Sequence, residues 1–376
     1  EMGIATAGRS VVEQLRNLVK LTGEAGETSQ ANRVLVTCRE QFFREHGEAL
    51  KAARGETDSI SPLTNVALSF DGAIDTLERF TPKQIGEYLV KRLGKREGAK
   101  AQKVLKEKYL ASLADRPQLL EMIIKSLPRL QQEETKGGGS ITPGALYQAY
   151  TNEWLDDLRP RERQSSSEQL KRILEIVAVE LWGRIGNRIH YGDLYTLFKD
   201  RSDLREGLDP NQLDVELRTA AFLSRTPDGH YGFSHRSFLD FFLARQLARA
   251  AKEGPAPFGD ALALPRLSFE AMGFLLDLLS RDESLLESLL GSLLAAPSNP
   301  KTGTNLVLLA YSLSTRRAGQ SRNPEGPIQG EMSRLVPPGA SLVGIDLSEA
   351  VMPGIGLPGA DLRRSIFARG SFSGAR

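Results

Sequence analysis

From Thr81 onward, apolar residues recur three or four positions apart, which predicts amphipathic helices rather than strands. Thr81 and Pro82 open the first helix, because threonine caps a helix start and proline suits its first turn. Its apolar face is formed by Ile85, Leu89 and Leu93. A second helix is predicted over 116–130, opened by Asp115 and Pro117. This part of the chain is therefore expected to be a helical domain.

A glycine-rich stretch at 136–144, KGGGSITPG, predicts a linker to the next domain. The elements expected after it are helices over 145–158 and 167–181, a short strand at 189–191, a short helix from Asp193, a helix over 214–223, a hairpin around Gly229, and a helix over 236–252 capped by Ser234. Helix, short strand, two helices and a two-stranded hairpin follow one another in a winged helix.

The first seventy residues have a different pattern. A helix over 11–21 and a polar loop precede the short apolar run 34–38, which is typical of a strand buried in a parallel sheet. A second apolar stretch at 65–70 is a candidate for the next strand. Two strands are too few for a whole α/β domain, so an incomplete α/β domain is predicted at 1–70.

A proline-rich hinge at 254–267 leads into leucine-rich helices. Their leucine stripe, over 285–294, is short and flanked by acidic residues, which favours a packing face over a membrane anchor.

The pattern changes to a period of five near the C-terminus. Large apolar residues recur as Leu342, Leu347, Met352, Leu357, Leu362, Phe367 and Phe372. Small or apolar residues precede them by two positions as Ala340, Ile345, Ala350, Ile355, Ala360 and Ser365. A period of five belongs to neither a helix nor a strand. The stretch 333–376 resembles the pentapeptide-repeat family, which implies the start of a right-handed parallel β-helix with four repeats in each coil.

Composition narrows the function classes. The 376 residues are 40% hydrophobic and 26% charged, as in globular proteins of more than one domain. A net charge of +2 gives no strong attraction to nucleic acid or to anionic membranes. Cys38 is the only cysteine, which fits a reducing cytoplasm. Neither a membrane span nor a signal peptide is expected. Because the first residue is Glu1 and the last falls within a repeat, a fragment of a longer protein is expected.

Several stretches resemble motifs of the bacterial NACHT-type STAND NTPases, in the order of that family. They are VLVTCREQFF at 34–43, FTPKQI at 80–85, LADRPQLL at 113–120, the pairs Leu146-Tyr147 and Trp154-Leu155, and YGFSHRSFLDFF at 231–242. Asp240 stands where the family more often has glutamate, and Ala244 is retained. The resemblance covers roughly residues 1–250 and gives an ordered set of motifs, which is more specific than any one of them.

The resemblance implies a nucleotide site shared by several domains. Arg39, which follows the buried strand, would contact the terminal phosphate of ATP, and Pro117 would pack on adenine. His235 would hold the β-phosphate of ADP, at a helix start where free N–H groups also favour an anion. Glu1 would end a Walker B motif as the acid that activates water. Without the resemblance, the residues themselves favour other interpretations. Arg39 would be a solvated charge, Pro117 a helix-initiating proline and His235 a half-buried histidine.

The function implied is that of a signalling switch. ADP would hold it closed, and ATP with Mg²⁺ would favour oligomerisation after the C-terminal repeats sense a trigger, in bacterial antiphage or conflict signalling. The lysine-bearing P-loop is absent from this sequence, so the chain is not expected to hydrolyse ATP alone. The predicted parts are the NACHT α/β remnant at 1–70, a helical domain at 71–135, a winged helix at 142–252, a second helical segment at 253–332 and the repeats at 333–376.

The sequence leaves two other functions open. A winged helix can bind DNA, but the helix expected at 214–223 carries Asp214 and Glu216 beside Arg218, which would repel phosphates. A pentapeptide module can mimic DNA, but such a mimic needs an acidic surface, and the visible repeats carry Arg363, Arg364, Arg369 and Arg376. An interaction or DNA-binding scaffold without nucleotide switching is thus the alternative, and a metal site is not expected.

Overall fold

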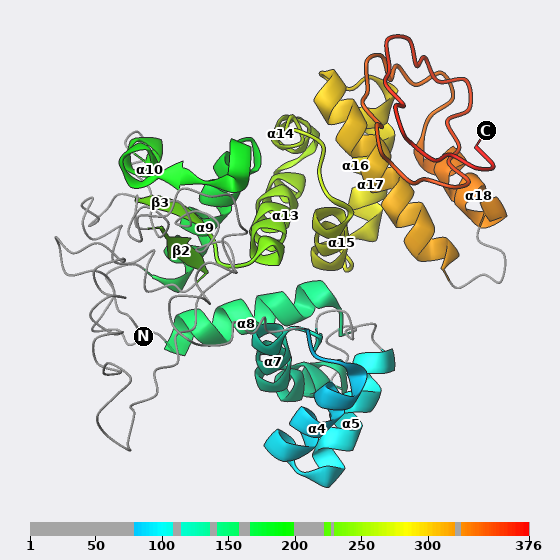
Figure 1. The fold of residues 1–376 in the computed structure, drawn as a ribbon. Helices are drawn as coiled ribbons and strands as arrows, with labels where there is room; N and C mark the ends of the chain where they lie inside the picture. The colour runs from blue at the N-terminus through cyan, green and yellow to red at the C-terminus, as the bar shows by residue number, and fades with distance from the viewer. Residues whose placement is uncertain are drawn as a thin grey trace, which may run out of the picture. The chain divides into compact units, whose positions relative to one another are not determined.

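The computed structural model describes residues 79–107, 114–135, 141–157, 166–198, 222–226, 229–319 and 325–375 (Figure 1). The chain divides into two units, Glu1–Arg79 and Phe80–Arg376. The described residues are mainly helical, with twelve α-helices, one 3₁₀-helix and three β-strands. The α/β unit expected at 1–70, including Arg39 and Glu1, lies outside the described residues.

The first described helices follow the predicted pattern closely. Helix α4 spans Pro82–Leu93 and begins at a reciprocal cap between Thr81 and Gln84. The Gln84 backbone N–H donates to Thr81 Oγ1 at 3.3 Å, and the Thr81 N–H donates to Gln84 Oε1 at 2.9 Å. Ile85 and Leu89 are buried, as their spacing predicts. Helix α7, Pro117–Thr135, matches the helix predicted over 116–130, whereas α5, Lys95–Glu107, was not among the predicted elements.

The next part is a small three-stranded sheet among helices. Its elements are α8 Pro143–Asp157, α9 Ser167–Trp182, a 3₁₀-helix Ile185–Asn187, β1 Ile189–His190, α10 Tyr191–Phe198, β2 Leu223–Arg225, β3 His230–Phe233 and α13 Arg236–Glu253. The strands are antiparallel in the order β1-β3-β2. The hairpin predicted around Gly229 is confirmed, with Gly229 at φ +86°.

Two details of this region differ from the prediction. Leu223, expected to end a helix, opens β2 because its backbone pairs with Phe233 across the hairpin. The cap of α13 is His235 rather than Ser234. His235 has the extended backbone of a cap residue, at φ −144° and ψ 142°, whereas the Ser234 hydroxyl is buried with no hydrogen-bond partner among the described residues.

The C-terminal helices form the second helical segment. They are α14 Pro255–Ala261, α15 Phe269–Leu278, α16 Glu283–Ala295, α17 Pro300–Ala318 and α18 Glu325–Leu335. The region expected to be a hinge therefore contains a helix, because Pro255 occupies its first turn, where a missing N–H costs nothing. The leucine stripe is a packing face, with Leu286, Leu289, Leu290 and Leu294 buried. Among the helices described, none is long and apolar enough to cross a membrane.

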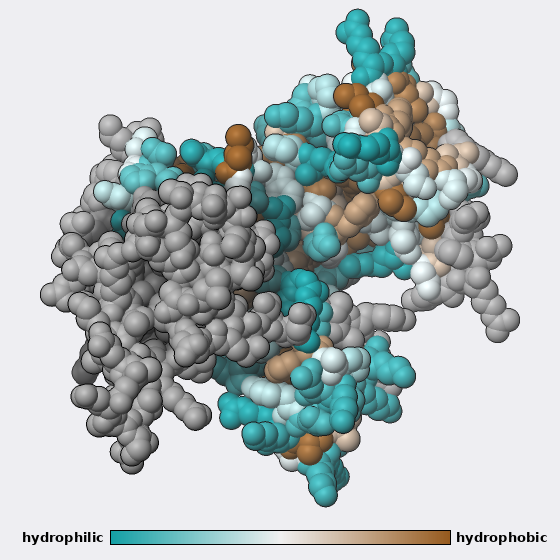
Figure 2. Space-filling view, in the orientation of Figure 1, coloured by the Kyte–Doolittle hydropathy of each residue, from teal (hydrophilic) through white to brown (hydrophobic). Residues whose placement is uncertain are grey.

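Beyond α18 the chain winds in two turns that lie one on the other. Parallel bridges join residues twenty positions apart, Ser341 to Asp361, Asp346 to Ile366 and Val351 to Ser371. The large residues of the first turn, Leu342, Leu347 and Met352, are fully buried. Those of the second turn are more open, and Phe367 is 39% exposed. Hydrophobic surface gathers over these repeats, toward the upper right of Figure 2.

Helix α17 lies against the first of these turns. The Asp346 backbone N–H donates to Thr304 Oγ1 at 2.9 Å, and the Tyr311 hydroxyl donates to the Pro353 carbonyl at 3.1 Å. A Cβ on Gly303 would come within 3.0 Å of Ile345, so the small residue permits close contact. The helix thus covers the side of the first turn that the second turn leaves uncovered.

The start of α8 is held by an aspartate from α15. Asp277 Oδ2 accepts from the Gly144 N–H at 2.7 Å, and its Oδ1 accepts from Arg316 on α17 at 2.6 Å. Asp277 is nearly buried, and the carboxylate at a helix N-terminus interacts favourably with the helix dipole. One side chain therefore ties α8 to α15 and α17.

We expect the substitution Gly144→Ala to break this connection. An added Cβ would lie 2.4 Å from the Asp277 Cβ, so α8 and α15 must separate. The expected loss of unfolding free energy is about 1–3 kcal/mol, measured by urea denaturation. Gly273→Ala, on α15 with no atom within 4 Å of the added Cβ, is the control and should be neutral or slightly stabilising. Equal stability of the two variants would contradict the steric argument.

Candidate functional site

The candidate site is built around the first turn of α13. The short strand β3 ends at Phe233, and His235 follows it as the helix cap. Its Nδ1 accepts from the Ser237 backbone N–H at 3.1 Å and lies 2.5 Å from the Ser237 hydroxyl oxygen. The ring is therefore fixed through Nδ1, and its Nε2 points away from the helix that it caps.

The start of α7 meets this histidine. Arg116, directly before the first residue of α7, contacts His235 Nε2 through a guanidinium nitrogen, although the two residues are 119 positions apart. Pro117 is the first residue of α7, and its ring is exposed. Asp115 Oδ1 lies 3.9 Å from Arg116 Nε. The Asp115 backbone carbonyl accepts from the Phe80 N–H at 2.7 Å. The structure thus brings Pro117 and His235 into one neighbourhood.

A buried tyrosine supports the site from α8. The Tyr147 hydroxyl donates to Ser237 Oγ at 2.6 Å. Its ring packs against Phe238 and Phe274, with centroids 5.2 Å and 4.9 Å away. Burial raises the pKa of Tyr147 to about 12, so the phenol keeps its proton at neutral pH.

Charge around the site favours an anion. The positive ends of the helix dipoles lie at the starts of α7 and α13. Arg116 adds a permanent positive charge between them. Two acids lie nearby. The Asp115 carboxylate is 3.9 Å from the Arg116 guanidinium. Asp240, one turn into α13, accepts from Ser268 at 2.7 Å, and burial raises its pKa. The arrangement can bind an anionic group such as phosphate.

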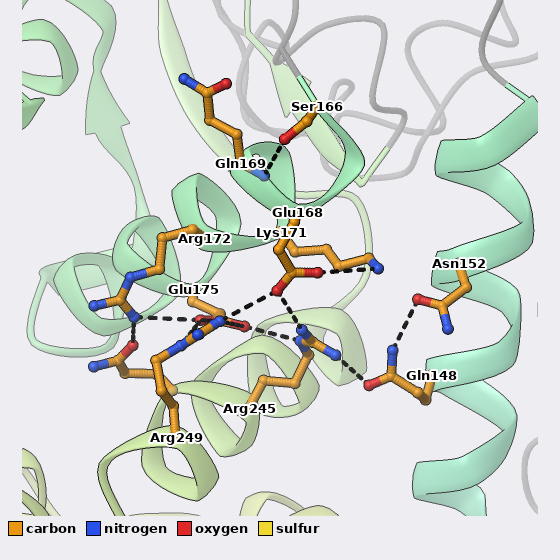
Figure 3. Close-up of polar contacts among 11 residues, drawn as sticks. Gln148, Asn152, Ser166, Glu168, Gln169, Lys171, Arg172, Glu175, Arg245 and Arg249 are labelled. Atoms are coloured by element: carbon orange, nitrogen blue, oxygen red, sulfur yellow. Dashed lines mark hydrogen bonds and ion pairs between the residues drawn. The ribbon is translucent and has the colours of Figure 1, made fainter. Parts of the chain in front are cut away.

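A polar cluster away from this site joins the helices that carry the site residues (Figure 3). Glu175 on α9 is fully buried and accepts from Arg245 at 2.9 Å, from Arg249 at 3.1 Å and from Arg172 at 3.3 Å. Arg245 also contacts Gln148 on α8. The carboxylate is therefore surrounded by donors, and the cluster links α8, α9 and α13 behind the site.

The other two expected site residues are not located by the structure. Arg39 and Glu1 lie outside the described residues. Within the ranges that the structure describes, no group of three or more His, Cys, Asp or Glu side chains could hold a metal ion. Arg116 and Tyr147 were missed as site residues. The sequence indication for both was that they lie within motif stretches, Arg116 in LADRPQLL at 113–120 and Tyr147 in the pair Leu146-Tyr147.

Comparison with known proteins gives one relevant relative. An uncharacterized WD repeat-containing protein of Nostoc sp. is 26% identical over 226 residues, which is 58% of this chain and 14% of the relative. The aligned part is therefore a small fraction of a much longer, repeat-containing protein. No protein-family profile and no solved structure matches the chain.

Proposed function

We propose that this chain belongs to a nucleotide-dependent signalling switch of the NACHT-type STAND class. ADP would hold the switch closed by bridging the start of α7 and the start of α13. Exchange for ATP with Mg²⁺ would release that bridge and permit self-oligomerisation. This mechanism is a population shift between two packings, biased by the contacts that each nucleotide makes.

The observation that supports this proposal is the contact of His235 with Arg116, the residue directly before Pro117. The motif resemblance predicts that Pro117 and His235 share one ligand, and the two belong to elements that lie far apart in sequence. Contact between Arg116 and His235 brings them to the same place. Two helix starts, a guanidinium and an imidazole are the groups expected around a phosphate. Arg39 and Glu1 would complete the site from the proposed α/β domain.

The proposal also assigns roles to the remaining helices, the small sheet and the C-terminal turns. The sheet β1-β3-β2 with α9, α10 and α13 would be a winged helix, and α4, α5 and α7 the helical domain. The C-terminal turns would begin a pentapeptide β-helix, supported by bridges at a separation of four five-residue repeats. That solenoid would sense the trigger. The relative, whose description names WD repeats, also supports a repeat-bearing sensor in the full-length protein.

The test is the nucleotide content of the purified full-length protein. We expect copurified ADP, released by denaturation and identified by chromatography. His235→Ala removes a donor to the phosphate, so we expect ADP to be lost or to exchange at least about tenfold faster. His190→Ala, in strand β1, is the matched control and should retain ADP.

Two outcomes would count against the proposal. One is a full-length protein without nucleotide whose melting temperature does not change on adding ADP. The other is equal ADP retention by His235→Ala and by the wild type. In the first case the chain is better described as an interaction scaffold, and a salt-sensitive DNA complex of residues 142–252 would favour DNA binding.

A further inference from the structure

We propose that the solvent face of α5 is a binding surface for double-stranded DNA, which it holds by the phosphates without reading the base sequence. We call this surface the basic face. It is formed by the exposed side chains of Lys95, Arg96, Lys100, Lys103 and Lys106. The inference does not depend on the nucleotide switch, because the hairpin of α4 and α5 carries no residue of the candidate site.

The charge of the chain is distributed unevenly, and this hairpin carries the positive excess. Residues 82–107 contain eight lysines and arginines and three glutamates, a net charge of +5. The whole chain has a net charge of +2, so the rest of it has a net charge of −3. The weak attraction to nucleic acid that the whole-chain charge predicts therefore does not apply to this hairpin. The surface over α4 and α5 is largely hydrophilic in Figure 2.

The packing of α5 on α4 turns the cations toward solvent. Ala101 and Leu105 are buried, and a Cβ on Gly98 would lie 2.9 Å from the backbone of Leu89, so the two helices cross at close range. With 3.6 residues in each turn, the five cations fall on the opposite side of the helix. At a rise of 1.5 Å per residue, the basic face is about 16 Å long.

Helix stability does not explain this arrangement. Lys95 and Arg96 lie in the first turn of α5, where the helix dipole disfavours cations. Arg96 and Lys100 are four positions apart, so they are neighbours of like charge. Glu97 pairs with Lys100 at 2.8 Å, whereas Lys95, Arg96 and Lys106 form no ion pair with an acid in the part of the chain that the structure describes. A bound polyanion would remove the repulsion.

The composition of the basic face favours duplex DNA among polyanions. The face contains no aromatic side chain, whereas single strands bind largely by stacking their bases on aromatic rings. The apolar side of α5 is already buried, so it cannot enter a lipid surface as a membrane-bound helix does. Duplex DNA carries one charge for about every 1.7 Å of its axis, which is denser than the charge of an acidic peptide. A rigid row of cations matches its regularly placed phosphates.

The test is the fluorescence anisotropy of a labelled DNA duplex of mixed sequence, titrated with the 376-residue chain. We expect the logarithm of the affinity to fall with the logarithm of the salt concentration with a slope of about −3 to −5, because each cation neutralises one phosphate. The triple variant Arg96→Gln, Lys103→Gln and Lys106→Gln should bind at least about tenfold more weakly at about 50 mM salt, and the slope should become shallower by about 2–3. Glutamine is a good helix former, so this variant should melt no lower than the wild type.

The matched control removes the same charge elsewhere, by Lys252→Gln, Arg281→Gln and Lys301→Gln, at three exposed positions outside α4 and α5. It should bind the duplex as the wild type does. A wild-type chain that binds no duplex, or an equal loss of affinity in the two triple variants, would overturn the proposal. Tighter binding to single-stranded DNA of the same sequence, to phosphatidylserine vesicles or to polyglutamate would also overturn it, because the face would then serve another partner.

Discussion

Glu175→Ala should destabilise the protein by about 3–5 kcal/mol, because it leaves a cluster of arginines without the carboxylate that joins them. Glu175 is fully buried, and Arg172, Arg245 and Arg249 all donate to it within 3.3 Å. Removing the acid costs these hydrogen bonds and adds repulsion among like charges. Equilibrium urea unfolding followed by circular dichroism measures the change.

The neighbouring Glu168 provides the control for this prediction. It belongs to the same cluster, but its side chain is 65% exposed. Water therefore screens its pairing, and Glu168→Ala should cost at most about 1 kcal/mol.

Raising the salt concentration should recover part of the stability of Glu175→Ala, because the remaining repulsion is screened. A Glu175→Ala variant as stable as Glu168→Ala would show that Glu175 does not hold the cluster.

Asn305→Leu should have an effect of similar size in the C-terminal helices. Asn305 is fully buried in α17, where its Oδ1 accepts from the Leu267 N–H at 2.9 Å. Its Nδ2 donates to the carbonyls of Leu262 and Leu264 at 3.0 Å and 3.1 Å. Leucine has nearly the same shape but leaves three backbone groups without this partner, at a total cost of about 3–5 kcal/mol.

The measurement is again the free energy of unfolding. Ser312→Ala, on the same helix and half-buried, serves as the control, because its hydroxyl bonds only the Leu308 carbonyl one turn earlier. That variant should change stability by no more than about 0.5 kcal/mol. If Asn305→Leu proved as stable as Ser312→Ala, the three bonds would not account for the conformation of the segment after α14.

The helices were predictable because local chemistry determines them. Thr81 and Gln84 form a cap from four consecutive positions, and the leucine stripe of α16 is read from its spacing alone. The period of five is likewise consistent with the parallel bridges between residues twenty positions apart. Where two adjacent residues could each cap the same helix, the sequence did not show which of them does so. Both Ser234 and His235 can cap α13, and the backbone angles of His235 together with its hydrogen bond from the Ser237 N–H distinguish them.

Contacts between distant parts of the chain were not predictable. Nothing in the residues around Arg116 indicates a partner 119 positions away. Glu175 lies in the middle of a helix, where a glutamate ordinarily faces water, and its burial follows from arginines on another helix. The exception is the pair Pro117 and His235, for which the motif resemblance implied a shared ligand and therefore proximity.

The cover that α17 provides has a consequence for the order of folding. The first repeat turn takes part of its hydrogen bonding from Thr304 and Tyr311, which precede it in the chain. A ribosome therefore delivers the template before the turns that stack on it. The second turn pairs with the first, so we expect synthesis in this order to favour a single register. We therefore expect α17 to help start the stack as well as to cover its end.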